Sequence, residues 1–131
     1  MIGRHLLIDF HEVSAERLDD AELLSHLLAE AARRGGLTPL GTPVLHHFEG
    51  GGLTGYLLLS ESHIAVHTYP ELGFAAIDIF ACGSGDPLAA LDHFRAELAP
   101  GRERVTTATR GEGLDSRVLS PTIPDESGEA P

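Results

Sequence analysis

The chain has 131 residues, a length that suits one domain, and 42% of them are hydrophobic, which is enough for a packed core. Its 9 Lys and Arg stand against 20 Asp and Glu, so the formal net charge of −11 repels nucleic-acid backbones and favours cationic small molecules. No apolar run reaches the roughly 18 residues of a membrane span, and the start of the chain lacks a signal-peptide pattern. A single cysteine indicates a reducing compartment. We therefore expect a cytoplasmic domain that binds neither nucleic acid nor membranes.

The first half of the chain predicts a strand, a helix and two more strands. The apolar run of Leu6, Leu7 and Ile8 predicts a buried strand over residues 3–10. Ser14 is the expected N-cap of a helix that ends at Gly35-Gly36. One face of that helix carries apolar residues at steps of three and four: Leu18, Ala21, Leu24, Leu28 and Ala31. Residues 38–49 and 53–60 follow as strands, separated by a glycine-rich turn.

The second half predicts two further strands, a helix and a last strand. Residues 63–69 alternate between two faces, and residues 74–82 are mostly apolar. Asp86 is placed to cap a helix whose expected apolar face is Leu88, Leu91, Phe94 and Leu98. Residues 105–109 form the last strand. Residues 111–131 are rich in proline, glycine and acids, so we expect a disordered tail after a single domain of residues 1–110.

The order β-α-β-β-β-β-α-β predicts an α+β fold. We expect a two-layer α/β sandwich, with a mostly antiparallel sheet and two helices on one face. The other face of the sheet then needs cover, because its apolar side chains would meet water. A homodimer supplies that cover, and the alternative is a monomer whose loops do so. The residues that argue for the dimer are Leu57, Leu59, Ile77 and Ile79.

Four histidines, His46, His47, His63 and His67, raise the question of a metal site. His63 and His67 are four residues apart on a predicted strand, so their Cα atoms are separated by roughly 13 Å. Metal–nitrogen bonds of about 2 Å cannot be shared across that gap. We expect no metal.

Three motifs in the middle of the chain carry the strongest functional signal. They are Ser60-Glu61-Ser62-His63, His67-Thr68-Tyr69-Pro70-Glu71 and Asp78-Ile79-Phe80-Ala81-Cys82-Gly83. In identity, order and spacing they resemble the short bacterial and archaeal class of S-adenosylmethionine decarboxylase proenzymes, which depend on a pyruvoyl group. The resemblance covers residues 3–110. Three linked motifs are far more specific than one short pattern.

The resemblance implies that the chain cuts itself between Glu61 and Ser62. Ser62 Oγ attacks the Glu61 carbonyl to form an ester, and His67 removes the Ser62 α-proton, a role suited to an imidazole near neutral pH. Elimination and hydrolysis then release ammonia and leave a pyruvoyl group at residue 62. Thr54 stands where the family usually has a serine that assists this processing.

The resemblance also assigns the decarboxylation chemistry. The pyruvoyl ketone takes the place of pyridoxal phosphate, forming a Schiff base with the substrate amine and accepting electrons as CO₂ leaves. Cys82 matches the proton donor. Phe48, contributed by the partner subunit, and Tyr69 would hold the adenine, while Glu71 would bind the ribose hydroxyls. No metal or pyridoxal phosphate is implied.

The predicted function is decarboxylation of S-adenosylmethionine, which supplies the aminopropyl donor for polyamine and spermidine synthesis. The same fold and chemistry acting on L-arginine or L-ornithine is one alternative, and a non-catalytic regulatory paralogue is another. Residue by residue, the plainer readings are a turn serine for Ser62, a core cysteine for Cys82 and a core aromatic for Phe48. Glu71 could also be a solvated turn acid.

Overall fold

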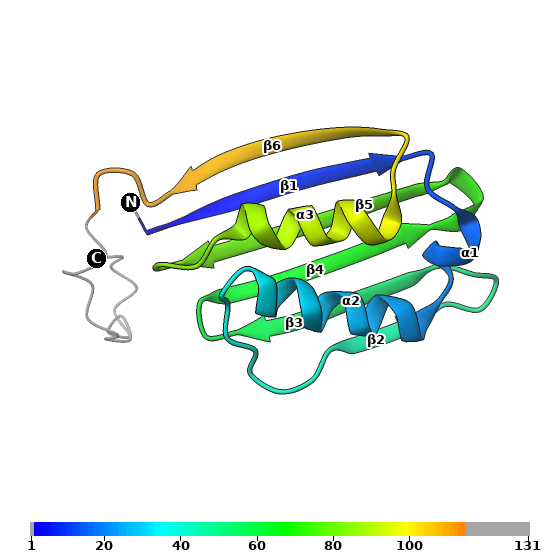
Figure 1. The fold of residues 1–131 in the computed structure, drawn as a ribbon, viewed down its shortest axis with the longest axis horizontal. Helices are drawn as coiled ribbons and strands as arrows, with labels where there is room; N and C mark the ends of the chain where they lie inside the picture. Colours follow the sequence, from blue (N-terminus) through cyan, green and yellow to red (C-terminus); the bar gives the residue numbers. More distant parts are fainter. Residues whose placement is uncertain (1, 115–131) are drawn as a thin grey trace, which may run out of the picture.

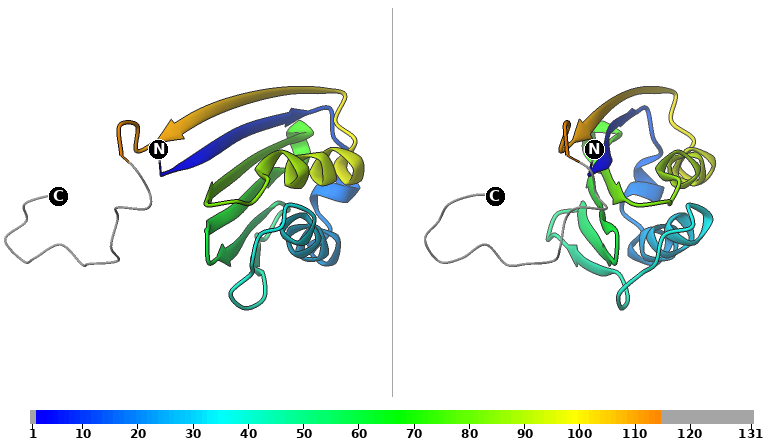
Figure 2. Two further views of the ribbon diagram at one scale, coloured as in Figure 1. Left: turned by 60° about the vertical axis from the view of Figure 1, so that its left-hand side comes forward. Right: turned by 90° about the vertical axis from the view of Figure 1, so that its left-hand side faces the viewer.

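The computed structural model describes residues 2–114 and shows six antiparallel strands in the order β2-β3-β4-β5-β1-β6 (Figure 1). The helices lie on one face of this sheet (Figure 2), so the predicted two-layer α+β sandwich is confirmed. In chain order the elements are β1 (Gly3–His11), α1 (Ala15–Leu18), α2 (Ala21–Arg34), β2 (Val44–His47), β3 (Leu53–Leu59), β4 (Ser62–Tyr69), the 3-10 helix η1 (Pro70–Leu72), β5 (Phe74–Cys82), α3 (Pro87–Leu98) and β6 (Arg102–Arg110).

The strands alternate between a face covered by the helices and a face turned away from them, which we call the open face. In β4, Ile64 and Val66 are fully buried under the helices, and His63 and His67 point to the open face. Antiparallel neighbours in register share a face. The buried side chains of the central strands and of α2 and α3 therefore form one core, with Phe94 of α3 among its largest members.

The four residues from which we predicted a dimer lie on the helix-covered face. Leu57, Leu59, Ile77 and Ile79 are at most 2% exposed within the single chain, so they need no partner and that part of the argument was wrong. The sequence shows which residues alternate but not toward which face the helices fold. The open face has its own exposed apolar side chains, which are Leu7, Val44, Tyr56, Leu58 and Tyr69.

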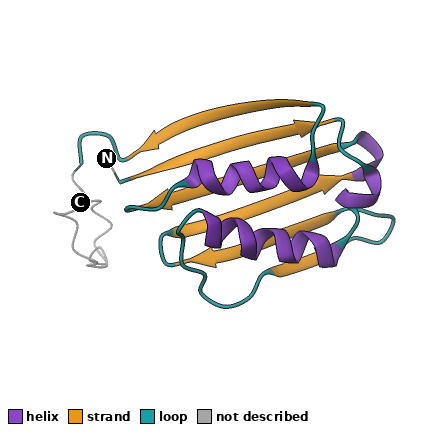
Figure 3. Cartoon of the chain, viewed as in Figure 1, coloured by secondary structure: helices purple, strands orange, loops and turns teal. Residues whose placement is uncertain are grey.

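The helix predicted after Ser14 is two helices, as Figure 3 shows. The short α1 ends at Leu18, and α2 begins after Asp20, whose carboxylate accepts a hydrogen bond from the Leu23 N–H at 3.0 Å. Ser14 precedes α1 but makes no side-chain cap. The break turns the Asp19 side chain toward the loop between β2 and β3, where it makes contacts described below.

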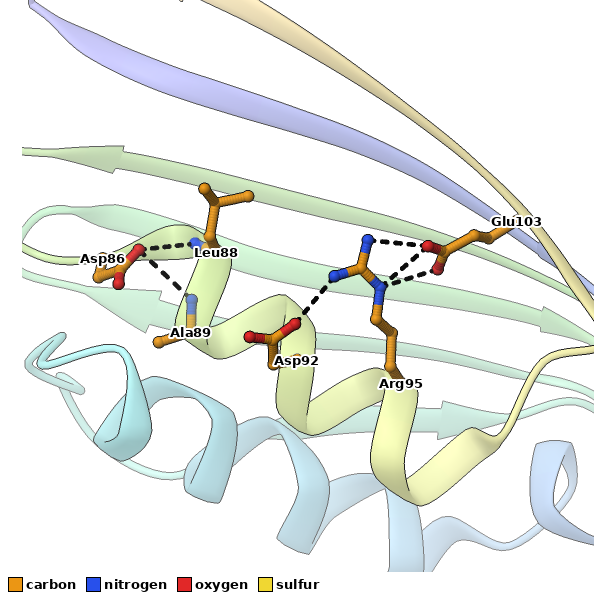
Figure 4. A network of polar contacts seen from close by, with 6 residues as sticks. All are labelled: Asp86, Leu88, Ala89, Asp92, Arg95 and Glu103. Atoms are coloured by element: carbon orange, nitrogen blue, oxygen red, sulfur yellow. Dashed lines mark hydrogen bonds and ion pairs between the residues drawn. The ribbon is translucent and has the colours of Figure 1, made fainter.

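Helix α3 begins five residues after Cys82 and is held at both ends (Figure 4). The Asp86 carboxylate caps its first turn by accepting from the N–H groups of Leu88 and Ala89. Arg95 binds Glu103 of β6 at 2.8 Å. The predicted apolar face was wrong at Leu88, which is 47% exposed, because about 100° per residue carries it away from the line of buried side chains. The buried apolar side chains of α3 are Pro87, Ala90, Leu91, Phe94 and Leu98.

The last strand is longer than predicted, since β6 pairs with β1 over its whole length from Arg102 to Arg110. Gly111 to Leu114 form a turn. The rest of the predicted tail, residues 115–131, lies outside the described residues. Within residues 2–114, no helix is long and apolar enough to cross a membrane.

Candidate active site

Ser62 begins β4 directly after the tight turn from β3, and its backbone is strained. Its φ of 153° lies in a region that side chains other than glycine rarely adopt. Such a conformation costs about 1–3 kcal/mol and persists only where the surrounding structure enforces it. Here β4 is paired on both sides, with Leu59 of β3 and Ala81 of β5 opposite Ser62. The strain therefore lies next to the Glu61–Ser62 bond.

Cys82 contacts both residues of that bond. Its Sγ lies 3.8 Å from Ser62 Oγ, and its backbone N–H donates a hydrogen bond of 3.1 Å to the Glu61 carbonyl oxygen. A close backbone approach makes this arrangement possible, because β1 passes the end of β5 at Gly3. A Cβ at Gly3 would lie 2.7 Å from the Ala81 carbonyl oxygen and 3.2 Å from the Cys82 Cα. The half-buried thiol thus sits at one end of the sheet beside Ser62.

A second group of predicted residues gathers at the other end of β4. His67 lies opposite Thr54 of β3, and its Nδ1 is 3.2 Å from the Thr54 hydroxyl. Both side chains border a pocket of about 260 Å³. The same pocket is lined by all three predicted substrate-binding residues, Phe48, Tyr69 and Glu71, so Phe48 lies beside the same pocket as Tyr69 within one chain, whereas the resemblance implied that the partner subunit contributes Phe48. The structure therefore brings these five residues together.

The loop that carries Phe48 is held by a residue that sequence reasoning missed. Asp19 accepts hydrogen bonds from the Gly52 N–H at 2.9 Å and from His47 Nε2 at 2.7 Å. The Gly52 N–H, followed by the contact with His47, lowers the pKa of Asp19. Only the Asp19-Asp20 pair that ends one helix and starts the next marks this position in the sequence.

Thr68 supports the pocket from beneath and was also missed. Its hydroxyl is buried, donates to the Leu18 carbonyl at 2.7 Å and accepts from the Leu53 N–H at 2.8 Å. It lies between His67 and Tyr69 on β4, so these two bonds fix the strand from which both pocket residues project. Alternation along β4 predicted only that Thr68 shares a face with Ile64 and Val66.

The two groups are far apart within one chain. His67 is five residues from Ser62 on an extended strand, so their Cα atoms are separated by about 16 Å. A general base must come within about 3 Å of the proton it removes, or act through one water. The His67 of a chain therefore cannot reach the Ser62 of that same chain.

The other histidines raised in the sequence have separate environments. His46 packs against Phe48 with ring centroids 4.5 Å apart, and His47 binds Asp19. His63 stacks on Tyr56 on the open face. Burial, and then the nearby His5, lower the pKa of His63 and favour its neutral form. These contacts indicate that His46 and His63 pack against aromatic rings and that His47 holds the loop after β2.

Comparison with known proteins identifies the family. A family model described as S-adenosylmethionine decarboxylase matches residues 4–111. The chain belongs to this family. Relatives named S-adenosylmethionine decarboxylase proenzyme include one from Symbiobacterium thermophilum, 46% identical over 97 residues and covering 73% of each chain. Another, from Thermotoga maritima, is 40% identical over 111 residues, which is 84% of this chain and 85% of the relative.

A solved structure of the family has the same fold. The crystal structure of adenosylmethionine decarboxylase from Aquifex aeolicus aligns with a TM-score of 0.79 and 31% identity, covering 93% of this chain and 96% of that one. The family resemblance predicted from the three motifs is confirmed. The site residues themselves stay predictions, now with the positions described above.

Proposed function

We propose that the chain cuts itself between Glu61 and Ser62, and that the pyruvoyl group formed at residue 62 decarboxylates S-adenosylmethionine. The activity follows from the family to which the chain belongs, and the named relatives do not favour arginine or ornithine as substrate or a non-catalytic role. The observation that carries the self-cleavage is the surroundings of the Glu61–Ser62 bond, with its strained φ and the Cys82 N–H on its carbonyl.

This geometry suits the first step of processing. Ser62 Oγ attacks the Glu61 carbonyl carbon, and the C–N bond between the two residues breaks. The nitrogen of Ser62 takes up the proton that the hydroxyl loses and becomes a free amine. The Cys82 N–H would stabilise the negative charge that develops on the carbonyl oxygen, as backbone donors do in oxyanion holes. Leaving the unfavourable φ of Ser62 also favours the shift.

The second step needs a base, and we propose that it comes from another copy of the chain. Removal of the Ser62 α-proton expels the Glu61 carboxylate, and water then releases ammonia and leaves the ketone. Because His67 lies about 16 Å along the strand from Ser62 in its own chain, the His67 that acts belongs to the partner subunit. The protein then works as a homodimer whose two sites each combine Ser62 and Cys82 of one copy with His67 of the other.

Two features of the open face support this dimer. It exposes apolar side chains over several strands, which water disfavours and a second sheet would cover. The pocket beside His67, at about 260 Å³, is also smaller than the roughly 300–1,000 Å³ of typical small-molecule sites. A second copy that places its Ser62 end against the pocket would enlarge and complete it.

Substrate binding follows from the pocket lining. Phe48 and Tyr69 offer rings for the adenine, where stacking contributes about 1–3 kcal/mol per base. The Glu71 carboxylate can accept hydrogen bonds from the ribose hydroxyls. The pyruvoyl ketone supplies an electron sink for decarboxylation, and Cys82 is placed to donate a proton to the substrate carbon that loses CO₂. We place the enzyme in the cytoplasm, where its lone cysteine would stay reduced.

The test combines mass spectrometry with substrate assays. Intact mass should show two fragments, residues 1–61 and 62–131, the second beginning with a ketone in place of an amine. The purified enzyme should release CO₂ from S-adenosylmethionine and not from L-arginine or L-ornithine. An intact 131-residue chain, or CO₂ release from one of the other two substrates alone, would refute the proposal.

A further inference from the structure

A short segment from the connection between α2 and β2 runs beside the residues that precede the cleavage point. The Ser60 N–H donates to the Thr38 carbonyl at 2.9 Å, and the Leu40 N–H donates to the Leu58 carbonyl at 2.8 Å. Pro39 bridges to Leu59 between these bonds. The segment therefore adds a short antiparallel pairing to the end of β3, directly before the turn that contains Glu61.

Thr38 also holds the side chain of Glu61. Its N–H donates to Glu61 Oε1 at 2.9 Å, and its hydroxyl donates to Glu61 Oε2 at 3.1 Å. Burial of this carboxylate opposes its ionisation, but hydrogen bonds from Thr38, from the Glu61 N–H and from the Ser60 hydroxyl outweigh burial and lower the pKa of Glu61. One residue thus binds both carboxylate oxygens as well as the backbone of Ser60.

We propose that Thr38 is a positioning residue for self-cleavage and acts by fixing the orientation of Glu61. This inference rests on the proposed cleavage between residues 61 and 62. The Glu61 carbonyl is the group that Ser62 Oγ attacks, and Glu61 is held from two sides, by Cys82 at its carbonyl oxygen and by Thr38 at its carboxylate. A displacement of about 1 Å between reacting groups can cost about a hundredfold in rate.

The role of Thr38 is confined to the cutting step. It does not line the pocket beside His67, and it neither gives nor takes a proton when the C–N bond of Glu61 is replaced by the ester bond. After cleavage, Glu61 is the end of the first fragment and no longer part of the bond being formed or broken. Cleavage should therefore depend on Thr38, and decarboxylation by chains already cut should not.

The experiment follows cleavage during cell-free synthesis of the full chain by pulse–chase, and then measures CO₂ release per cut chain. Thr38→Val keeps the shape and the N–H bond but removes the hydroxyl. Because hydrogen bonds to charged groups are strong but this one is reached by water, we expect cleavage to slow about three- to tenfold. Thr38→Ser should restore it, and Thr42→Val, at an exposed threonine of the same connection, should leave it unchanged.

A double-variant cycle tests whether Thr38 acts through Glu61. In a Glu61→Gln background the effect of Thr38→Val should shrink, because the charged acceptor is gone. Normal cleavage by Thr38→Val would overturn the inference, as would failure of Thr38→Ser to restore it. A parallel loss of turnover per cut chain would do the same, since that result indicates a general disturbance of the fold. If the unaltered chain itself stays whole, the proposed function fails first, and the role of Thr38 with it.

Discussion

Two inactive variants should restore one another if the active site is shared between two copies of the chain. Ser62→Ala removes the residue that is cut, and His67→Ala removes the base that the second step needs. Within a single chain these residues are separated by about 16 Å along β4, so no movement of side chains alone brings them together. In a mixed dimer, one site combines Ser62 of the His67→Ala chain with His67 of the Ser62→Ala chain and is complete, while the other site lacks both.

The size of the effect follows from the two-fold symmetry of such a dimer. With equal expression and random pairing, half of the dimers are mixed, and one of the two sites in each is complete. Before separation, about half of the His67→Ala chains should therefore be cut, and activity should reach about a quarter of the unaltered level; in purified mixed dimers nearly every His67→Ala chain should be cut, and activity should reach about half. No Ser62→Ala chain should be cut in any dimer.

The assay is co-expression of the two variants with different affinity tags, followed by sequential purification of mixed dimers. Mass spectrometry then reports which chain is cut, and CO₂ release from S-adenosylmethionine reports activity. A matched control pairs Ser62→Ala with Cys82→Ala: these residues lie on the same side of the site, so neither site of that mixed dimer is complete. Purified mixed dimers of the first pair in which neither chain is cut would refute the shared site.

Three further outcomes are expected. Ser62→Ala alone should give one uncut chain of 131 residues by intact mass, and a cut at the same bond would show that another group starts the reaction. Cys82→Ala should still be cut but turn over about 10²–10⁴-fold more slowly and lose activity after few cycles, because the proton donor is gone; long-lived normal turnover would remove the thiol from the mechanism. Thr68→Val, measured by urea unfolding in the Ser62→Ala background, should lower stability by about 2–4 kcal/mol, since it leaves a buried N–H and a buried carbonyl unpaired. Thr107→Val, at an exposed threonine, serves as the control, and an equal loss of stability in both variants would contradict this reasoning.

The sequence alone determined the elements whose signals are local. Alternation along residues 63–69 correctly put Ile64 and Val66 on one face and His63 and His67 on the other, because successive side chains on any strand point to opposite faces. The predicted strand of residues 74–82 has those same bounds in the structure. The cap at Asp86 was also correct, since a helix N-terminus needs an acceptor within a few residues. The three motifs identified the family, because linked residue identities at fixed spacing are specific without any knowledge of the fold.

The tertiary structure decided whatever depends on contacts between distant segments. Which face of the sheet the helices cover is set by the packing of α2 and α3, so Leu57 and Ile77 proved to be core residues and not part of an interface. The length of β6 depends on its pairing with β1, and the polar sequence of β6 gives no local sign of that pairing. The hold of Thr38 on Glu61 joins residues 23 positions apart and has no local pattern. The sequence predicted a strand over residues 63–69 with Ser62 directly before it, so the distance between Ser62 and His67 could have been estimated without the structure. Our proposal that this distance separates two halves of a shared active site depends on the structure, which has a pocket at one end of β4 and the strained Ser62 at the other.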